Sequence, residues 1–443
     1  MRSKSTNLIL LLTVGLLTLL ANSGMVLSYF PIYLYILIPS AALINTLPIL
    51  VKKPPFGKRL YFLIHGYYYL YIYIVSTILS IGYQLFLCLL FIQEFSYFYM
   101  VNLLICSGIL AVTLYIGLTI ICCTSTQLRL RLRLWGICLG LIPVINIIIL
   151  VLILRKAKSE IRVESEKELR NQQRLPQQIC KTKYPILLVH GIFFRDNGRF
   201  AYWGRIPEEL RQNGATVFFG NQPSAASIPE CARILTNRIK QIKKETGCEK
   251  VNIIAHSKGG LDCRYAMAFC GAAPHVASLT TVSTPHRGSP FADYLLNKIS
   301  HKSQKRICYI YNKTLNKFGE PEADLITASR QLTTDYCISL DKRMPPPKGV
   351  FCQSIGSTLI KPRKGHFPIN ITGFVMANIT QANDGLVCED SFAWGERYTL
   401  INPDSPIGVS HSDVTDLFRI NHPDFDVREF YVQLVADLKA KEL

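Results

Sequence analysis

The stretch that decides the fold of this chain is Ile253-Ile254-Ala255-His256-Ser257-Lys258-Gly259-Gly260. An apolar run typical of a strand ends abruptly in a serine flanked by small residues. A serine on a sharp turn between a strand and a helix needs small residues two positions before and after it, here Ala255 and Gly259. The helix expected from Lys258 would direct its first N–H groups at an anion beside Ser257. The stretch therefore predicts an exposed nucleophile, with an ordinary strand-to-helix turn as the alternative.

Strand-like and helix-like segments alternate around this turn. The patterns predict strands at residues 185–189, 216–219, 251–255 and 276–282, and helices at 203–212, 229–245 and 258–270. Strands separated by helices pair in parallel, with right-handed crossovers and helices on both faces of the sheet. The second part of the chain is therefore predicted to be an α/β domain. The alternation stops at about residues 288–347, an insertion that we expect to form a lid over the site.

The first part of the chain has the composition of a membrane region. Residues 5–51, 60–93, 95–128 and 134–154 contain no Lys, Arg, Asp or Glu, and a membrane helix needs about 20 apolar residues. The first run is long enough for two helices. We therefore expect an all-α bundle of about five transmembrane spans in residues 1–154, a charged linker at 155–183 and the α/β domain at 184–443. A cleavable signal peptide at residues 1–28 is the competing interpretation.

The basic residues give two possible orientations in the membrane. With five spans, the basic clusters near residues 2–4, 52–59 and 129–133 share one side, which the positive-inside rule assigns to the cytoplasm. The α/β domain would then lie outside the cytoplasm, the orientation favoured here. However, Arg155, Lys156, Lys158 and Arg162 follow the last apolar run and also indicate the cytoplasm. If residues 134–154 re-enter at Pro143 instead of crossing, the α/β domain lies inside the cell.

Charge and cysteine usage narrow the classes of partner. The formal net charge is +19, which suits an anionic lipid surface, whereas no nucleic-acid-reading motif occurs. The 14 cysteines show no repeated spacing typical of zinc sites, and disulfides cannot be inferred from them. No obligate protein partner is indicated.

A nucleophilic serine needs a base, a carboxylate to orient the base, and donors for an oxyanion. Asp384, in the turn Asn383-Asp384-Gly385, follows Ser257 in the chain. The order serine, acid, histidine leaves His411 and His422 as bases, and the polar loop around His411 favours that residue. The backbone N–H groups of Ile192, after His190-Gly191, and of Lys258 are the expected oxyanion donors.

Five blocks in this order resemble those of bacterial triacylglycerol lipases. They are His190-Gly191, residues 255–260, residues 284–288, residues 383–387 and residues 410–413. The resemblance covers about residues 184–443 and implies an α/β-hydrolase fold, hydrolysis of acylglycerol esters and the triad Ser257, Asp384 and His411. It also implies a calcium site with Asp413 as a ligand. No Asp or Glu lies between Lys342 and Asn383, where a second ligand is expected, so the sequence gives calcium little support and implies no cofactor.

Three functions remain compatible with these residues. The first is a membrane-anchored lipase or carboxylesterase that acts on lipid esters through an acyl-enzyme on Ser257. The second is a lipid acyltransferase or phospholipase that uses the same three residues. The third is a scaffold that keeps the fold without catalysis.

Overall fold

A computed structural model describes residues 4–23, 33–50, 56–90, 97–139, 145–192, 201–298, 300, 302–304, 306, 309, 313, 325–380, 382–401 and 404–443. The chain divides into two compact units, Met1–Gln172 and Gln173–Leu443. We call them the N-terminal helical unit and the C-terminal α/β unit.

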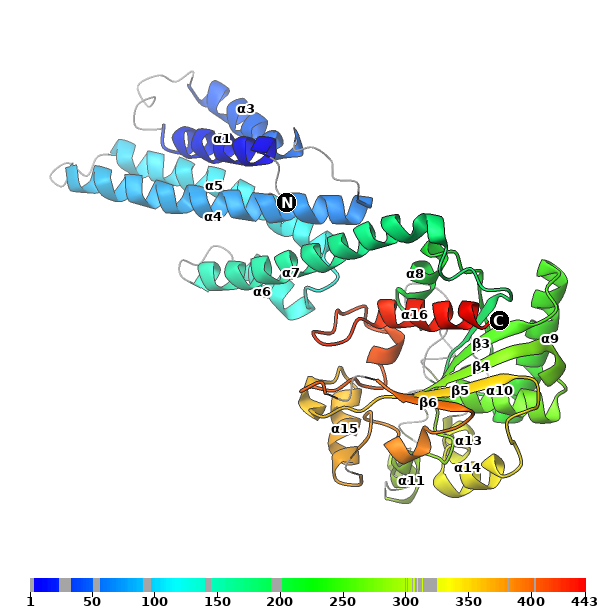
Figure 1. The fold of residues 1–443 in the computed structure, drawn as a ribbon. Coiled ribbons are helices and arrows are strands. Elements are labelled where there is room, and N and C mark those ends of the chain that lie inside the picture. The colour runs from blue at the N-terminus through cyan, green and yellow to red at the C-terminus, as the bar shows by residue number, and fades with distance from the viewer. Residues whose placement is uncertain are drawn as a thin grey trace. The chain divides into compact units, whose positions relative to one another are not determined.

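The C-terminal α/β unit is built on one six-stranded sheet, in the order β2-β1-β3-β4-β5-β6 (Figure 1). All neighbouring strands pair in parallel. The strands are β1 (Ile186–Val189), β2 (Val217–Phe219), β3 (Val251–His256), β4 (Val276–Val282), β5 (Phe351–Gly356) and β6 (Arg397–Leu400). The predicted fold class, an α/β-hydrolase sheet preceded by apolar helices, is confirmed.

Helices cover both faces of this sheet, as parallel strands require. Leu188 of β1 packs in a cluster with α8 (Ile206–Gln212) and α16 (Val427–Ala440), whereas its neighbour Leu187 packs with α9 (Ile228–Thr246) and α10 (Lys258–Phe269). Figure 1 shows these two pairs of helices on opposite sides of the sheet. Side chains alternate between faces along a strand, so each central strand is buried on both sides. β1 is apolar throughout, whereas β3 and β4 also contain buried polar residues such as Asn252 and Thr280.

The segment between β4 and β5 carries the region predicted to be a lid. It contains α11 (Pro290–Asn297), α13 (Leu325–Arg330) and α14 (Thr334–Asp341). Much of the stretch from 299 to 324 lies outside the described residues, so a lid at 288–347 stays a prediction. A further helix, α15 (Ile369–Ala377), lies between β5 and β6 in the chain.

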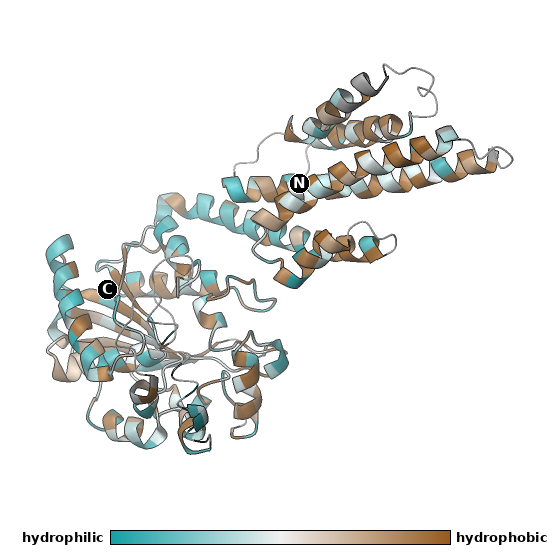
Figure 2. Ribbon diagram, turned by 180° about the vertical axis from the view of Figure 1, so that it is seen from behind, coloured by the Kyte–Doolittle hydropathy of each residue, from teal (hydrophilic) through white to brown (hydrophobic). Residues whose placement is uncertain are grey.

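The helices of the N-terminal helical unit are mostly apolar and brown in Figure 2, whereas the second half of α7 is charged and teal. Their bounds are α1 (Lys4–Ala21), α3 (Tyr33–Thr46), α4 (Lys58–Leu90), α5 (Tyr97–Thr124), α6 (Leu130–Cys138) and α7 (Ile145–Arg174). Three described segments are long and apolar enough to cross a membrane: Lys4–Ala21, Lys58–Leu89 and Tyr99–Thr124. Five crossings stay a prediction. The described residues of the run 134–154 include the end of α6 and the beginning of α7, and α7 continues through most of the predicted linker.

Candidate active site

Ser257 occupies the tight turn between β3 and α10. Its backbone has φ 54° and ψ −131°, a conformation that L-residues rarely adopt and that is found where a strained turn presents a side chain. The neighbouring backbone is so close that a Cβ atom on Gly191 would lie 2.7 Å from the Cβ of Ser257, and one on Gly259 would collide with the carbonyl oxygen of His190. Gly259, one of the two small residues noted in the sequence, is therefore required by contact with the end of β1.

Asp384 and His411 meet although 27 positions separate them in the chain. Nδ1 of His411 lies 2.7 Å from Oδ2 of Asp384, and the N–H of His411 donates to the carbonyl oxygen of Asp384 at 2.9 Å. The Asp384 carboxylate is fully buried, and its Oδ1 accepts the N–H groups of Leu386 and Val387 at 3.0 and 2.9 Å. Because Nδ1–H would donate to this carboxylate, Nε2 of His411 is left to act as a base.

The His411 ring also lies against the elbow. Its centroid is 4.5 Å from that of His256, the residue directly before Ser257. The structure thus brings Asp384 and His411 into one hydrogen-bonded pair and places that pair beside the turn that carries Ser257. The pairing of Ser257 with His411 as nucleophile and base stays a prediction.

The two expected oxyanion donors flank the turn from different strands. Ile192 follows Gly191 beyond the end of β1, is largely buried, and packs with Ala328 of α13, a helix of the predicted lid. Lys258 is the first residue of α10, so its N–H is one of those that a helix leaves unpaired at its start. Their role in binding an oxyanion stays a prediction.

The Lys258 side chain turns away to make a buried ion pair. Its Nζ lies 2.9 Å from Oδ1 and 3.1 Å from Oδ2 of Asp262, one helical turn later, and 3.4 Å from Sγ of Cys231. Burial raises the pKa of Asp262 to about 6, against the opposing effect of the Lys258 charge. The pair fixes the first turn of α10, so only the backbone of Lys258 is available at the serine.

His256 is held by a partner that the sequence did not reveal. Its Nδ1 lies 2.6 Å from the hydroxyl of Tyr202, and burial, followed by the charge of His411, lowers the pKa of His256 well below its ordinary value. Tyr202 lies far from the elbow in the chain and belongs to no recognisable motif. Only its aromatic character, next to Trp203, could have drawn attention to it.

Two other histidines, His286 and the less favoured candidate base His422, have hydrogen-bond partners elsewhere. His286 receives a hydrogen bond from Arg264 at Nδ1 (2.8 Å) and lies 3.0 Å from Thr281 Oγ1 at Nε2, so both ring nitrogens are engaged. His422 bonds the carbonyl oxygen of Gly408 through Nε2 at 3.0 Å. His411 is the histidine that faces the predicted acid.

Asp413 has a local role in the loop that carries His411. Its Oδ2 accepts the backbone N–H of Ser410 at 3.0 Å and the Ser410 hydroxyl at 2.6 Å. Within the described ranges, His, Cys, Asp and Glu side chains form no group of three or more that could hold a metal ion. Oδ2 of Asp413 is thus engaged within its own loop, a calcium site there stays untested, and no step of the chemistry below involves a metal.

Comparison with known proteins gives relatives that include several triacylglycerol lipases. The chain is 35% identical over 179 residues to a triacylglycerol lipase of Pseudarthrobacter phenanthrenivorans, covering 37% of this chain and 54% of that protein. It is 30% identical over 253 residues to triacylglycerol lipase 2 of Saccharomyces cerevisiae, covering 54% of this chain and 74% of that protein. A crystal structure of Staphylococcus hyicus lipase matches with a TM-score of 0.45 and 17% identity, covering 59% of this chain and 97% of the other.

The coverage differs between these relatives. The chain spans about half the length of two bacterial lipases, 54% and 49%, but nearly three quarters of the yeast protein. No family model matches the chain. The matched share of this chain, about half or less, leaves room for the N-terminal helical unit outside the similarity.

Proposed function

Because this chain belongs to the triacylglycerol lipase family, we propose that it is a membrane-anchored serine hydrolase that cleaves lipid esters through an acyl-enzyme on Ser257. The observation that carries the proposal is the buried pair of Asp384 and His411, 2.7 Å apart, beside a serine held in a strained turn. A base oriented by a carboxylate next to such a serine is the arrangement that acyl transfer needs.

The proposed reaction uses each part of this geometry once. Nε2 of His411 takes the proton of the Ser257 hydroxyl as the oxygen attacks the ester carbonyl, and Asp384 stabilises the imidazolium that forms. The N–H groups of Ile192 and Lys258 bind the negative oxygen of the tetrahedral intermediate. His411 then returns the proton to the leaving alcohol, and water hydrolyses the acyl-enzyme by the same steps.

An exposed apolar surface near the acid supports a lipid as the substrate. Phe367 and Ile371 are 72% and 54% exposed, and Phe374 and Ile379 are exposed beside them. Ile369, at the start of α15, lies against Gly385, the residue after the proposed catalytic acid. A Cβ atom on Gly385 would lie 2.5 Å from Cγ2 of Ile369. Exposed apolar groups of this size mark contact sites for lipid or protein. We call residues 367–379 the α15 surface.

Basic side chains begin the same segment. Lys361, Arg363 and Lys364 precede the α15 surface, and all three are exposed. Apolar side chains that enter a lipid interface and lysines that attract its anionic headgroups act together in membrane binding. The α15 surface therefore favours aggregated lipid over a soluble ester.

Covalent labelling tests the proposal in the full-length chain. A fluorophosphonate probe should label wild-type protein and Ser303→Ala, in which an exposed serine is replaced, but not Ser257→Ala. Ester hydrolysis should fall by several orders of magnitude in Ser257→Ala and in His411→Ala. Labelling or turnover that persists in Ser257→Ala would remove Ser257 as the nucleophile.

A further inference from the structure

Two consecutive helices of the N-terminal helical unit, α6 (Leu130–Cys138) and the first part of α7 (from Ile145), cover the apolar run at 134–154 within the described residues. α6 has 9 residues and a length of about 13 Å, less than half of the roughly 30 Å hydrocarbon core. Its Gly136 packs on α7, because a Cβ on Gly136 would lie 2.9 Å from Cδ1 of Ile153. Before α6 begins, the hydroxyl of Ser125 donates to Glu160 of α7 at 2.6 Å. As the chain advances from Ser125 to Gly136, its contact on α7 moves back from Glu160 to Ile153, so the segment that leads through α6 runs antiparallel to α7.

Contacts with α4 show how deep the hairpin reaches. Nη1 of Arg59, near the beginning of α4, lies 2.5 Å from Glu160 of α7. Asn146, near the beginning of α7, donates to the hydroxyl of Tyr73 at 2.9 Å. Tyr73 lies near the middle of α4, which spans Lys58–Leu90. α7 therefore begins beside the middle of α4 and runs back to the end at which α4 begins.

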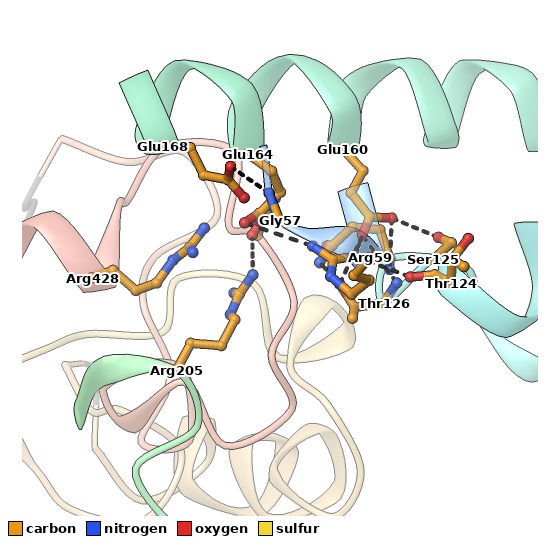
Figure 3. A network of polar contacts seen from close by, with 12 residues as sticks. Gly57, Arg59, Thr124, Ser125, Thr126, Glu160, Glu164, Glu168, Arg205 and Arg428 are labelled. Carbon is orange, nitrogen blue, oxygen red and sulfur yellow. Dashed lines mark hydrogen bonds and ion pairs between the residues drawn. The ribbon is translucent and has the colours of Figure 1, made fainter. Parts of the chain in front are cut away.

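A polar network closes this end of the helices, as Figure 3 shows. Besides Ser125 and Arg59, the Glu160 carboxylate accepts the N–H of Thr126 at 3.1 Å. Arg59 also donates to the carbonyl oxygen of Thr124, the last residue of α5, at 3.0 Å. The Glu160 side chain is fully buried there. The start of α4, the end of α5 and the charged half of α7 thus meet in one place.

The first helix begins at this end as well. Asn22, just after α1, donates to Ser80 at 2.9 Å and accepts from Gln84 at 2.8 Å, both in the last third of α4. Leu10, earlier in α1, shares a buried cluster with Tyr68 in the first half of α4. α1 and α4 therefore run in the same direction, and Lys4 lies at the end that carries Lys58.

Every described basic residue up to position 162 consequently belongs to one end of the N-terminal helical unit. These residues are Lys4, Lys58, Arg59, Arg129, Arg131, Arg133, Arg155, Lys156, Lys158 and Arg162. With a fifth crossing, the last four would lie on the opposite side from the others. The positive-inside rule assigns a basic end to the cytoplasm, and the hairpin satisfies this rule for all of them.

We propose that residues 130–154 re-enter the membrane as a hairpin, so that the C-terminal α/β unit lies on the cytoplasmic side and takes its esters from lipid facing the cytoplasm. The proposal rests on the membrane anchoring proposed above. It replaces the extracytoplasmic placement that a fifth crossing implies. The chain leaves the membrane where α7 turns from apolar to charged, at about Arg155.

Protease protection of the full-length chain distinguishes the two placements. One epitope tag precedes Met1 and a second follows Leu443, and protease is added to spheroplasts of a bacterial expression host. We expect both tags to survive in intact spheroplasts and to disappear after permeabilisation. An external loop of a resident membrane protein, which must be cut, and a soluble cytoplasmic protein, which must survive, are the controls.

Loss of the C-terminal tag alone from intact spheroplasts would establish an odd number of crossings and overturn the hairpin. Loss of both tags would overturn the cytoplasmic assignment. Fluorophosphonate labelling and alkaline extraction of the same membranes test the proposed function separately. A chain that is labelled and resists extraction, but whose C-terminal tag is cut from outside, would retain the hydrolase proposal and refute only the topology.

Discussion

The hydroxyl of Tyr202 lies 2.6 Å from Nδ1 of His256, and the His256 ring packs on that of His411 with 4.5 Å between centroids. Tyr202 is therefore linked to the predicted base through a second imidazole. His256 is buried and has a lowered pKa, so it stays neutral and supports the His411 ring by packing against it.

Replacement of Tyr202 by Phe should weaken the support that His256 gives to the His411 ring. The change leaves Nδ1 of buried His256 without its partner, which costs about 1–3 kcal/mol of stability. We expect the melting temperature to fall and kcat on a soluble ester to drop several-fold, with KM little changed. Tyr309→Phe, at a tyrosine that is 65% exposed, is the matched control. Equal behaviour of the two variants would show that Tyr202 does not position the site.

Asp384→Asn should preserve the fold and abolish most of the turnover. The amide is nearly isosteric with the carboxylate, but it cannot stabilise the imidazolium or hold the same tautomer of His411. By analogy with a serine protease in which this change was made, kcat should fall by about 10⁴-fold. Asp437→Asn, at a half-exposed carboxylate, should retain wild-type kcat. A loss of less than about tenfold in Asp384→Asn would argue against Asp384 as the acid.

The stability of the protein should depend on pH through its buried histidines. Burial lowers the pKa of both His256 and His286 well below the ordinary 6.5. Below about pH 6.5 the unfolded chain binds protons that the folded chain does not, so the free energy of unfolding falls as the pH falls. The contribution of these groups is fully present above that pH.

Asp262 acts in the opposite direction. Its pKa is raised to about 6, so the folded state holds this proton more tightly, and this group favours folding as the pH falls. A comparison of variants separates the two effects. Chemical denaturation in detergent at pH 7.5 and 5.5 should show a shallower fall for His286→Gln than for wild type, by up to about 1.4 kcal/mol per pH unit. Parallel pH profiles would contradict this assignment.

Glu160→Gln should destabilise the N-terminal helical unit. Glu160 is buried and pairs with Arg59, which is 39% exposed, and removal of one partner of a buried pair leaves the other uncompensated. Since solvent screens part of the Arg59 charge, we expect a loss of about 2–3 kcal/mol, measured as a lower aggregation temperature in detergent. Glu166→Gln, at an exposed position of the same helix, should leave this temperature unchanged.

The parts of the fold that the sequence predicted are those with a strong local pattern. β1 is a continuous apolar run because both faces of the sheet are covered, and Ser257 follows β3 as expected. β3 and β4 are mostly apolar but include buried polar residues such as Asn252 and Thr281. β5 was not predicted, because its buried Gln353 is satisfied by Thr280 on β4 at 2.9 Å, a contact that only the folded chain supplies. The edge strand β6 has two exposed residues and no apolar pattern.

Composition alone also could not separate a crossing from a hairpin at residues 134–154. The same apolar residues suit either, and what distinguishes them are long-range contacts such as Asn146 with Tyr73 and Glu160 with Arg59. In the site, Asp384 and His411 followed from chain order, whereas Tyr202 and Arg264 act through contacts that no motif encodes.

The α15 surface should decide between dispersed and aggregated substrates. Phe367 and Ile371 are its two most exposed apolar residues, and transfer of each side chain into lipid is worth about 1.5–3 kcal/mol. The double variant Phe367→Ser and Ile371→Ser should therefore reduce hydrolysis of emulsified acylglycerol or of vesicle lipid by tenfold or more. Turnover of a short soluble ester should stay at the wild-type level, because neither residue belongs to the catalytic pair or to the elbow. Ile338→Ser, at a partly exposed position of α14, controls for the loss of a surface isoleucine elsewhere. If the double variant lost activity on both kinds of substrate equally, the α15 surface would support the fold around Asp384 rather than contact lipid.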